Sequence, residues 1–399
     1  MAPTFAVVRL HGTEVGALYY DRGGTWFEYN DDLLSHDHRV LGQVFEDDPH
    51  TVRSAKTGLP AWFANLLPEG ELRHQIIREM GGGNVSDYRL LLRLGSDLPG
   101  AVTVEADQEP DDSADAPAAE PAADHALRYS LAGMQLKYSI HSSRLTAPVS
   151  GEDSWWVAKL PDRTLTKLAE NEYFTMRWLA TAGFDVPRVQ LAPATSVGGL
   201  PADALGDDDL VYLVERFDRI PGGRVHSEDF AQLANVWPHQ KYGEFGATYS
   251  TMGAVILHLT GNGGFEAFLS RLVAAVIVGN VDAHLKNWAI YYPDGRTPTL
   301  APVYDFHSLT VYQRFRYTPL ALALPGERMP SRVDPSHLAD LAREAGASPS
   351  LAAETVAATV SRLRQAWSGD LLAQAHEWYP TLAAHYESRL HGLPLARAT

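Results

Sequence analysis

Apolar and polar residues alternate along the first thirty positions of the chain, in three short segments. The segments 4–10, 14–21 and 25–30 are separated at His11-Gly12 and at Arg22-Gly23-Gly24. A period of two residues with glycine-containing breaks is typical of strands joined by tight turns. The pattern therefore predicts a small antiparallel meander at the start of the chain.

The next segment, 66–83, changes to a helical period. A proline stands early, apolar residues recur at spacings of three and four, and glycines follow; the residues are Pro68, Leu72, Ile76, Ile77, Met80 and Gly81. This order predicts a helix that starts near the proline and ends at the glycines. A second helix over 86–95 and a strand over 100–105 complete a β-rich N-terminal domain, which we expect to span residues 1–104.

Residues 105–124 differ in composition from both of their neighbours. They contain eight acidic residues, no lysine or arginine, and many prolines and alanines. A segment of this kind cannot bury enough apolar surface to offset its chain entropy. We predict an acidic linker over residues 105–126.

Behind the linker, strand patterns come first and helix patterns follow. Strands are predicted over 128–140, 154–160, 189–194 and 210–218, with one helix over 169–187, and helix patterns dominate from Ser227 onward. We assign a β-rich lobe to residues 127–225 and a helical lobe to residues 226–399. The predicted fold class is α+β, with the two-lobed layout of protein kinases, and this analogy concerns the fold alone.

Composition and charge restrict the possible functions. The chain has 33 basic and 49 acidic residues, a net charge of -16, which argues against coating nucleic acid directly. It has no cysteine, and therefore no disulfide framework and no cysteine zinc site. The first ten residues have neither a basic start nor an apolar stretch long enough for export, so we expect no export signal, and the apolar run near Leu272 is short for a membrane span. We expect a soluble, cytoplasmic protein with no membrane role that reaches DNA only through a partner.

Charged and amide side chains gather directly after that apolar run. The residues are Asp282, His284, Lys286 and Asn287, and Asp305 follows beyond a hairpin pattern whose turn lies near Asp294-Gly295. We expect Gly279 to end the helix 265–278 in a left-handed conformation, so that the cluster lies in a loop. The hairpin then places residue 305 roughly opposite residue 284, and the two acids and the amide meet at its open end.

An aspartate, an asparagine five residues later and a second aspartate beyond a hairpin match an arrangement used for phosphoryl transfer. One carboxylate accepts the proton of the attacking hydroxyl, while the amide and the other carboxylate hold magnesium on the ATP phosphates. The residues also fit a plainer account, with Asp282 as a turn cap, Asn287 bonded to the backbone and Asp305 a solvated acid. His284 equally fits a hydrogen-bonded loop residue, because no second histidine stands at zinc-ligand spacing.

An upstream ATP site would decide between these accounts, and three parts of the chain could form it. Lys159 ends an apolar strand, where it could contact phosphates and pair with Glu172 of the next helix, or it could reach outward to water. The segment 130–138 can turn backbone N–H groups toward a phosphate. The segment 213–219 ends a strand between the lobes and could bind an adenine edge, or Glu215 and Arg216 could form a surface pair.

With these pieces in one order, the sequence resembles the HipA family of bacterial serine/threonine kinase toxins. The matching segments are "FANLLPEGELR", "SLAGMQLKY", "VAKLP", "ENEYF", "VERFDR", "NVDAHLKN" and "PVYDF", which together extend over nearly the whole chain. The resemblance implies an ATP- and magnesium-dependent protein kinase with a β-rich N-terminal domain. Tyr304-Asp305-Phe306 stands where ordinary protein kinases have Asp-Phe-Gly, so the resemblance to that group is weaker.

The resemblance also implies roles for individual residues. Asp282 resembles the catalytic base, Asn287 and Asp305 the magnesium ligands, Glu172 the ion-pair partner of Lys159, and Ser130 the serine that HipA proteins autophosphorylate. The nucleotide would contact Ala132, Gly133, Met134, Gln135, Leu136, Lys137, Lys159, Glu215, Arg216, Phe217, His284, Leu285, Lys286, Asn287, Tyr304 and Asp305.

Partners follow from the same resemblance. HipA toxins bind a HipB-like helix-turn-helix antitoxin on operator DNA, and they phosphorylate proteins of translation such as aminoacyl-tRNA synthetases. Two other functions remain open from the sequence: a kinase-like scaffold that holds the antitoxin on DNA, and a kinase of small molecules.

Overall fold

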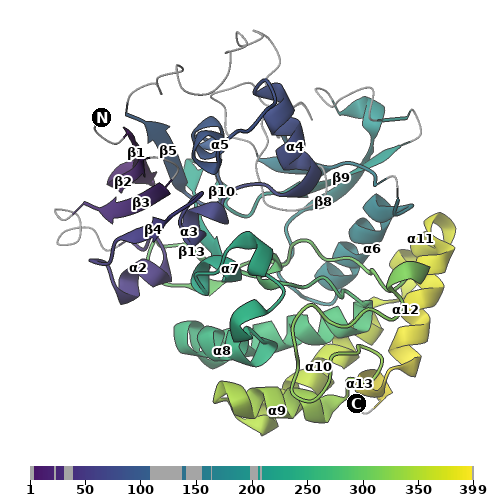
Figure 1. The fold of residues 1–399 in the computed structure, drawn as a ribbon. Coiled ribbons are helices and arrows are strands. Elements are labelled where there is room, and N and C mark those ends of the chain that lie inside the picture. The colour runs from purple at the N-terminus through teal and green to yellow at the C-terminus, as the bar shows by residue number, and fades with distance from the viewer. Residues whose placement is uncertain are drawn as a thin grey trace.

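The computed structural model describes residues 4–21, 24–30, 39–107, 137–140, 155–162, 164–197, 205–206 and 209–397. Three parts follow one another along the chain, an N-terminal domain, a small lobe and a large lobe, as the colours of Figure 1 show. Ser130, the expected autophosphorylation site, and residues 132–136, expected to contact the nucleotide, lie outside the described residues, as does most of the predicted linker.

The N-terminal domain is built on a five-stranded antiparallel sheet in the order β4-β3-β2-β1-β5. Its strands are β1 (Thr4–Leu10), β2 (Thr13–Asp21), β3 (Gly24–Tyr29), β4 (Arg53–Ala55) and β5 (Val102–Ala106). The predicted meander is therefore present, and alternate residues of β1 are buried, as its two-residue period requires. Strand β5 runs through Ala106, two residues into the segment expected as a linker.

Among the described residues, four helices accompany this sheet: α2 (Gln43–Asp47), α3 (Ala61–Ala64), α4 (Gly70–Glu79) and α5 (Asp87–Leu94). The last two are the helices that the sequence predicts. Ser86 caps α5, because its side chain accepts a hydrogen bond from the backbone N–H of Arg89. Helix α3 and the turn after it contain the segment "FANLLPEG", which faces the large lobe.

In its described part, the small lobe is an antiparallel sheet in the order β6-β7-β9-β8 with one α-helix. Its elements are β6 (Lys137–Ile140), β7 (Trp156–Lys159), α6 (Leu168–Thr181), β8 (Val189–Pro193) and β9 (Leu210–Glu215). Two short strands, β10 (Arg219–Ile220) and β11 (Gly223–Arg224), pair with each other after β9. The mainly β lobe with one helix agrees with the sequence pattern.

Both faces of the small-lobe sheet are covered. Trp156 and Ala158 of β7 belong to the same buried cluster as the core of the N-terminal domain. Val157, which lies between them and faces the other side, belongs to the core of the large lobe. The N-terminal domain therefore shares one continuous core with the small lobe.

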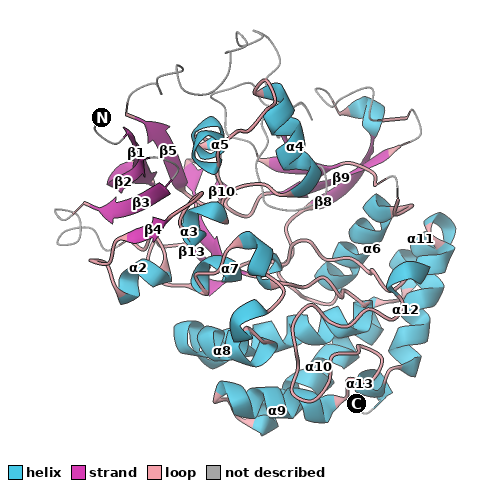
Figure 2. Ribbon diagram, in the orientation of Figure 1, coloured by secondary structure: helices cyan, strands magenta, loops and turns pink. Residues whose placement is uncertain are grey.

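The large lobe is mainly helical, as Figure 2 shows in cyan. It contains α7 (Phe230–Leu233), α8 (Tyr249–Val278), α9 (Pro335–Ala345), α10 (Pro349–Ala366), α11 (Gly369–Trp378), α12 (Pro380–Gly392) and α13 (Pro394–Arg397). Helix α8 is kinked at Gly261, whose φ is 69°, and its second half is almost entirely buried. Glu244–Val278 is the one described segment long and apolar enough to cross a membrane, and 67% of its apolar window is buried inside the fold.

The large lobe also contains a three-stranded sheet in the order β12-β13-β14. Strands β13 (Ala289–Tyr292) and β14 (Thr299–Leu300) form the predicted hairpin, and the pairing of Ile290 with Leu300 places residue 305 opposite residue 285 by extrapolation. Strand β12 (His226–Asp229) pairs with β13 and is not predicted by the sequence pattern, which is helical from Ser227 onward. Three of its four residues are buried polar side chains, so the strand lacks the alternation of apolar and polar residues by which a sequence pattern indicates a strand.

Candidate functional site

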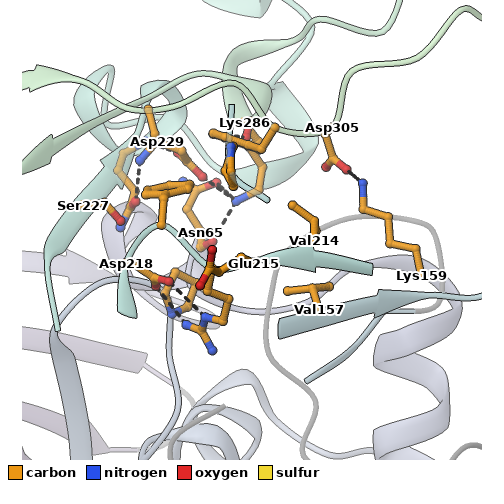
Figure 3. A pocket seen from close by; sticks show the side chains of 17 residues that line it. Asn65, Val157, Lys159, Val214, Glu215, Asp218, Ser227, Asp229, Lys286 and Asp305 are labelled. Carbon is orange, nitrogen blue, oxygen red and sulfur yellow. Dashed lines mark hydrogen bonds and ion pairs between the residues drawn. The ribbon is translucent and has the colours of Figure 1, made fainter. Parts of the chain in front are cut away.

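A pocket opens where the small lobe, the large lobe and the N-terminal domain meet (Figure 3). Its lining residues are Asn65, Pro99, Val157, Lys159, Pro187, Val214, Glu215, Arg216, Phe217, Asp218, Ser227, Asp229, Gln232, Lys286, Ala289, Tyr304 and Asp305. Val157 and Val214, on neighbouring strands, form an apolar wall, while Lys159 and Asp305 lie together at one end in the view of Figure 3. The pocket thus combines a flat apolar region with a charged end.

Lys159 occupies the charged end, between two carboxylates. It is 3% exposed, and its ammonium group donates to Glu172 of α6 and to Asp305. Burial alone would lower the pKa of Lys159, but the charges of Asp305 and Glu172 outweigh it and raise the pKa. An outward-reaching lysine, the alternative that the sequence left open, is therefore excluded.

Asp305 approaches Lys159 from a strained backbone conformation. Its φ is 53°, in the left-handed region that residues other than glycine seldom occupy. Strain of this kind persists only where surrounding structure enforces it, and it often marks functional sites. The neighbouring Tyr304 is fixed by its hydroxyl, which donates to the carbonyl oxygen of Lys286 at 3.0 Å.

Asp282 lies in the loop that follows α8, held by hydrogen bonds to its own backbone. Gly279 ends the helix with a φ of 82°, the predicted left-handed cap. The backbone N–H of Asp282 donates to Asn280 Oδ1 at 3.2 Å, and its carbonyl accepts from Asn287 Nδ2 at 2.8 Å. These bonds bring the predicted base and the predicted amide ligand together in one tight turn.

The carboxylate of Asp282 has one described hydrogen-bond donor, which the sequence analysis did not identify. The hydroxyl of Tyr242 donates to Asp282 Oδ1 at 2.9 Å. Burial raises the pKa of Asp282, and this hydrogen bond acts in the opposite direction. The charge of Asp305 also raises it, so the two acids lie close enough to interact.

His284 lies beside the same tyrosine and is a neutral residue near pH 7. Its ring meets that of Tyr242 edge to face, with centroids 5.1 Å apart. Burial, together with the positive charge of Lys241, lowers the pKa of His284 to about 3. The structure therefore gives His284 a packing position beside Asp282.

Glu215 ends β9 and Arg216 and Phe217 follow it. All three line the pocket, as the sequence analysis expects, but their side chains diverge. Glu215 pairs with Arg188 at 2.6 Å on the surface. Arg216 is 3% exposed and turns toward the N-terminal domain. A surface pair between Glu215 and Arg216, one of the two readings of the sequence, is not formed.

Arg216 belongs to a buried group of two acids and two arginines that joins β9 to the N-terminal domain. It contacts Asp97 and Asp218, both at 2.9 Å, and Arg219 contacts Asp97 at 2.7 Å and Asp218 at 2.9 Å. Burial opposes the ionised acid, but the two arginines outweigh it and lower the pKa of Asp218. Only the backbone of Arg216 is left to face a ligand in the pocket.

Phe217 and Tyr304 form an aromatic pair at the pocket, with ring centroids 5.6 Å apart and planes 30° from parallel. The first comes from the turn between β9 and β10, and the second from the segment that carries Asp305. A planar ligand between the apolar wall and this pair would touch both lobes.

Lys286 lines the pocket with its side chain, but its ammonium group is committed elsewhere. It donates to the carbonyl of Asn65 at 2.7 Å, to Asn65 Oδ1 at 3.0 Å and to Asp229 Oδ2 at 2.9 Å. An ammonium has three N–H donors, so all three are used. The expectation that Lys286 lines the nucleotide stays a prediction, in which its ammonium group has no hydrogen left to donate to the ligand.

The remaining predicted residues fall into three cases. Leu285 is buried in the core of the large lobe, 1% exposed, and does not line the pocket. Lys137 lies in β6 opposite Lys159, and nothing is described of its side chain. Ser130 and the residues Ala132, Gly133, Met134, Gln135 and Leu136 lie outside the described part of the chain.

Several pocket residues escaped the sequence analysis: Asn65, Pro99, Asp218, Ser227, Asp229 and Gln232. Two of them belong to the N-terminal domain and lie more than a hundred positions from the lobe residues that they meet. The segment "FANLLPEG" gave a signal as a motif, but no local pattern shows where a motif docks. Tyr242 stands between a lysine and a glycine in a loop and carried no signal at all.

Two lobes with a pocket between them, a buried lysine paired with a helical glutamate, and a strained aspartate facing that lysine define a kinase-like protein with an added β-rich domain. The family model described as "HipA-like C-terminal domain" matches residues 129–367, and the family model described as "HipA N-terminal domain" matches residues 6–105. The chain belongs to the HipA family.

Relatives and solved structures agree with this assignment. A protein of Sinorhizobium fredii named "Putative kinase Y4dM" is 37% identical over 377 residues, 91% of each chain. A second protein of that organism, "Putative kinase Y4mE", is 31% identical over 283 residues, 63% of this chain and 64% of that one. HipA of Shewanella oneidensis, solved in a complex with HipB and operator DNA, superimposes with a TM-score of 0.71 over 99% of both chains at 20% identity, which shows the fold.

Proposed function

We propose that this protein is a HipA-like toxin of a toxin-antitoxin system and acts as a serine/threonine protein kinase with ATP and Mg2+. The observation that carries the proposal is the position of Lys159, buried between Glu172 and Asp305 at the end of the interlobe pocket. A lysine on a small-lobe strand that pairs with a helical glutamate and faces an aspartate across the cleft is the arrangement that holds nucleotide phosphates in kinases.

The pocket residues fit a nucleotide with a divalent cation. The apolar wall of Val157 and Val214 suits a base, and the backbone beside Phe217 could bind its polar edge. Asp305 would hold the cation together with Asn287, whose amide nitrogen is committed to Asp282 and whose Oδ1 remains as an oxygen ligand. Among the described residues, no three His, Cys, Asp or Glu side chains form a metal site by themselves. When bound, magnesium would neutralise charge that develops on the transferred phosphoryl group.

In this proposal Asp282 is the catalytic base. It accepts the proton of a serine or threonine hydroxyl as the oxygen attacks the γ-phosphorus; the new O–P bond forms, the bond to the β–γ bridging oxygen breaks, and ADP leaves. The raised pKa of Asp282 supports this role, because a stronger base accepts a proton more readily. Lys159 would orient the phosphates, and Ser130 would be a second acceptor within the chain.

The same proposal extends to localisation and partners. The chain would act in the cytoplasm, bind a HipB-like helix-turn-helix antitoxin, and reach operator DNA only through that antitoxin. Its net charge of -16 fits an indirect route to DNA. Its substrate would be a protein of the translation apparatus, and an aminoacyl-tRNA synthetase is the class to examine first.

Intact-mass measurement tests the proposal. The purified chain is incubated with ATP and Mg2+, and Asp282→Ala is treated in the same way. We expect the wild type to gain one phosphate, mapped to Ser130, and the variant to gain none. Nucleotide binding without phosphate transfer by the wild type would contradict the kinase proposal and indicate a kinase-like scaffold for the antitoxin.

A further inference from the structure

The segment "FANLLPEG" of the N-terminal domain lies against the loop that carries the proposed base, although nothing above gives it a function. Asn65 is 2% exposed and lines the pocket, and Glu69 lies one turn further along the chain. Both residues form polar contacts with the large lobe rather than with their own domain's sheet. A buried asparagine placed between domains needs an explanation, because its polar atoms must all be satisfied there.

The side chain and carbonyl oxygen of Asn65 make four hydrogen bonds, one within its own domain and three with the large lobe. Its Nδ2 donates to Ala61 O at 2.9 Å and to Val236 O at 2.7 Å, which fixes the orientation of the amide. Its Oδ1 and its carbonyl oxygen then both accept from Lys286, at 3.0 and 2.7 Å. The asparagine thus supplies two of the three acceptors around the Lys286 ammonium, and Asp229 supplies the third.

Lys286 is separated from Asp282 by one turn of backbone and is adjacent to Asn287. Because all three of its N–H groups are used, this lysine holds the loop 282–287 in a fixed position against the N-terminal domain. If the hydrogen bonds between Lys286 and Asn65 were lost, the proposed base Asp282 and the proposed amide ligand Asn287 would no longer be held in position. A displacement of about 1 Å at a reacting group is enough to slow a reaction a hundredfold.

Glu69 supports the same loop by a second, independent route. Its carboxylate accepts from Lys241 Nζ at 2.7 Å, and Lys241 is 4% exposed. The carbonyl oxygen of Lys241 in turn accepts the backbone N–H of Leu285 at 3.1 Å. The two residues of "FANLLPEG" therefore hold consecutive positions of the loop, Asn65 at Lys286 and Glu69 at Leu285.

We infer that the N-terminal domain is a working part of the active site, and that Asn65 and Glu69 are positioning residues for the loop 282–287. They act through Lys286 and Lys241 and do not take part in the chemistry themselves. On this account, detachment of the segment "FANLLPEG" from the loop would abolish catalytic activity while the pocket stayed open. The effect on catalysis rests on the proposed kinase function, whereas the effect on the loop does not.

Hydrogen exchange tests the loop directly, in the full chain without nucleotide. We expect Asn65→Ala to raise exchange in peptides that cover residues 280–290 by about threefold or more, since loss of a local hydrogen bond lowers the free energy of local opening. Glu69→Ala should do the same at Leu285. Gln43→Ala is the matched control: Gln43 Nε2 donates to Tyr292 OH at 3.0 Å across the same interface, away from the loop.

Kinetics then show whether Asn65 acts through Lys286. We expect Asn65→Ala and Lys286→Met each to lower kcat by about tenfold or more, and the double variant to be no slower than Lys286→Met alone. Unchanged exchange over residues 280–290 in both Asn65→Ala and Glu69→Ala would overturn the inference, as would equal changes in Gln43→Ala. Additive losses of kcat would also overturn it. If the wild type transfers no phosphate, the proposed function fails and the exchange result still decides the inference.

Discussion

At the scale of single residues, the site depends on how burial and charge act on a few ionisable groups. Lys159 stays charged because two carboxylates compensate for its burial, and Asp282 is made more basic by burial. Spacing and residue type singled out both residues but left plainer readings open, and the family resemblance supplied their proposed roles. The sequence could not identify Tyr242, because the hydrogen bond to Asp282 joins positions that are forty residues apart and depends on the path of a loop.

Tyr242→Phe tests the electrostatics of the proposed base. The Tyr242 hydroxyl donates to Asp282 and lowers its pKa, so its removal should raise that pKa further. A base must be ionised to act, and the acidic limb of the pH profile of kcat should therefore move to higher pH. Tyr317→Phe, at a residue 77% exposed, is the control and should leave the profile unchanged. A shift to lower pH in Tyr242→Phe would contradict this role.

At the scale of elements, the parts that depend on local pattern are the ones the sequence predicted. The meander, the capped helices, the hairpin and the helix end at Gly279 follow from period, caps and turn residues. Strand β12 was missed because its buried residues are polar; His226 and Glu228 are buried against the N-terminal domain on one side and against Tyr292 of β13 on the other. Such residues carry no apolar period, so no local pattern reveals the strand.

Gly279→Ala tests whether the left-handed end of α8 at Gly279 positions the loop that carries Asp282. The glycine has a φ of 82°, and an added Cβ would lie 1.9 Å from Thr310 Oγ1. The left-handed conformation alone costs about 1–2 kcal/mol for a residue with a side chain, and the overlap adds to it. We expect a loss of more than about 2 kcal/mol in the free energy of unfolding, measured by denaturant titration.

The matched control is Gly263→Ala. This glycine lies in the same helix, and an added Cβ would meet no atom within 4 Å. Alanine has the higher helix propensity, so the control should be neutral or slightly stabilising. Equal destabilisation by both changes would show that the helix end is not specifically constrained.

His226 provides a pH test of β12. Its Nε2 lies 2.8 Å from Leu41 O and its Nδ1 accepts from Ala101 N at 3.4 Å, which requires the neutral ring. Burial lowers the pKa of His226 to about 4, below its value of about 6.5 in an unfolded chain. The unfolded state therefore binds the proton more tightly, and stability is lost as the pH falls from about 6.5 through 4.

His226→Gln removes this titration while keeping an amide donor and acceptor. Over that pH range the wild type should lose up to about 3 kcal/mol relative to the variant, the value of a shift of about two and a half pKa units. Denaturant titrations of both proteins at pH 7 and pH 4 measure the difference. A constant difference across the range would show that the histidine is not held neutral.

At the scale of the whole molecule, the N-terminal domain and the two lobes form one structure around the pocket. They share an apolar core through β7 and a buried ion-pair group through Asp97 and Arg216. The sequence predicted the three parts in the correct order but treated the first as a separate unit. The contacts that join them connect residues more than a hundred positions apart, and pattern within a segment carries no information about such contacts.

Calorimetry tests this unity. Because one core runs through the N-terminal domain and the small lobe, we expect a single unfolding transition that includes both. Asp97→Asn should lower the midpoint of that one transition, because a buried ion pair that loses a partner costs about 3–5 kcal/mol. Two separate transitions, with only the first shifted by the variant, would contradict the shared core.

Calorimetric titration with ATP most directly tests the claim that the pocket is a magnesium-nucleotide site. We predict that the wild type binds ATP more tightly in the presence of Mg2+, and that Asp305→Asn loses most of this dependence. Binding that is equally tight with and without Mg2+, or unaffected by Asp305→Asn, would contradict the account.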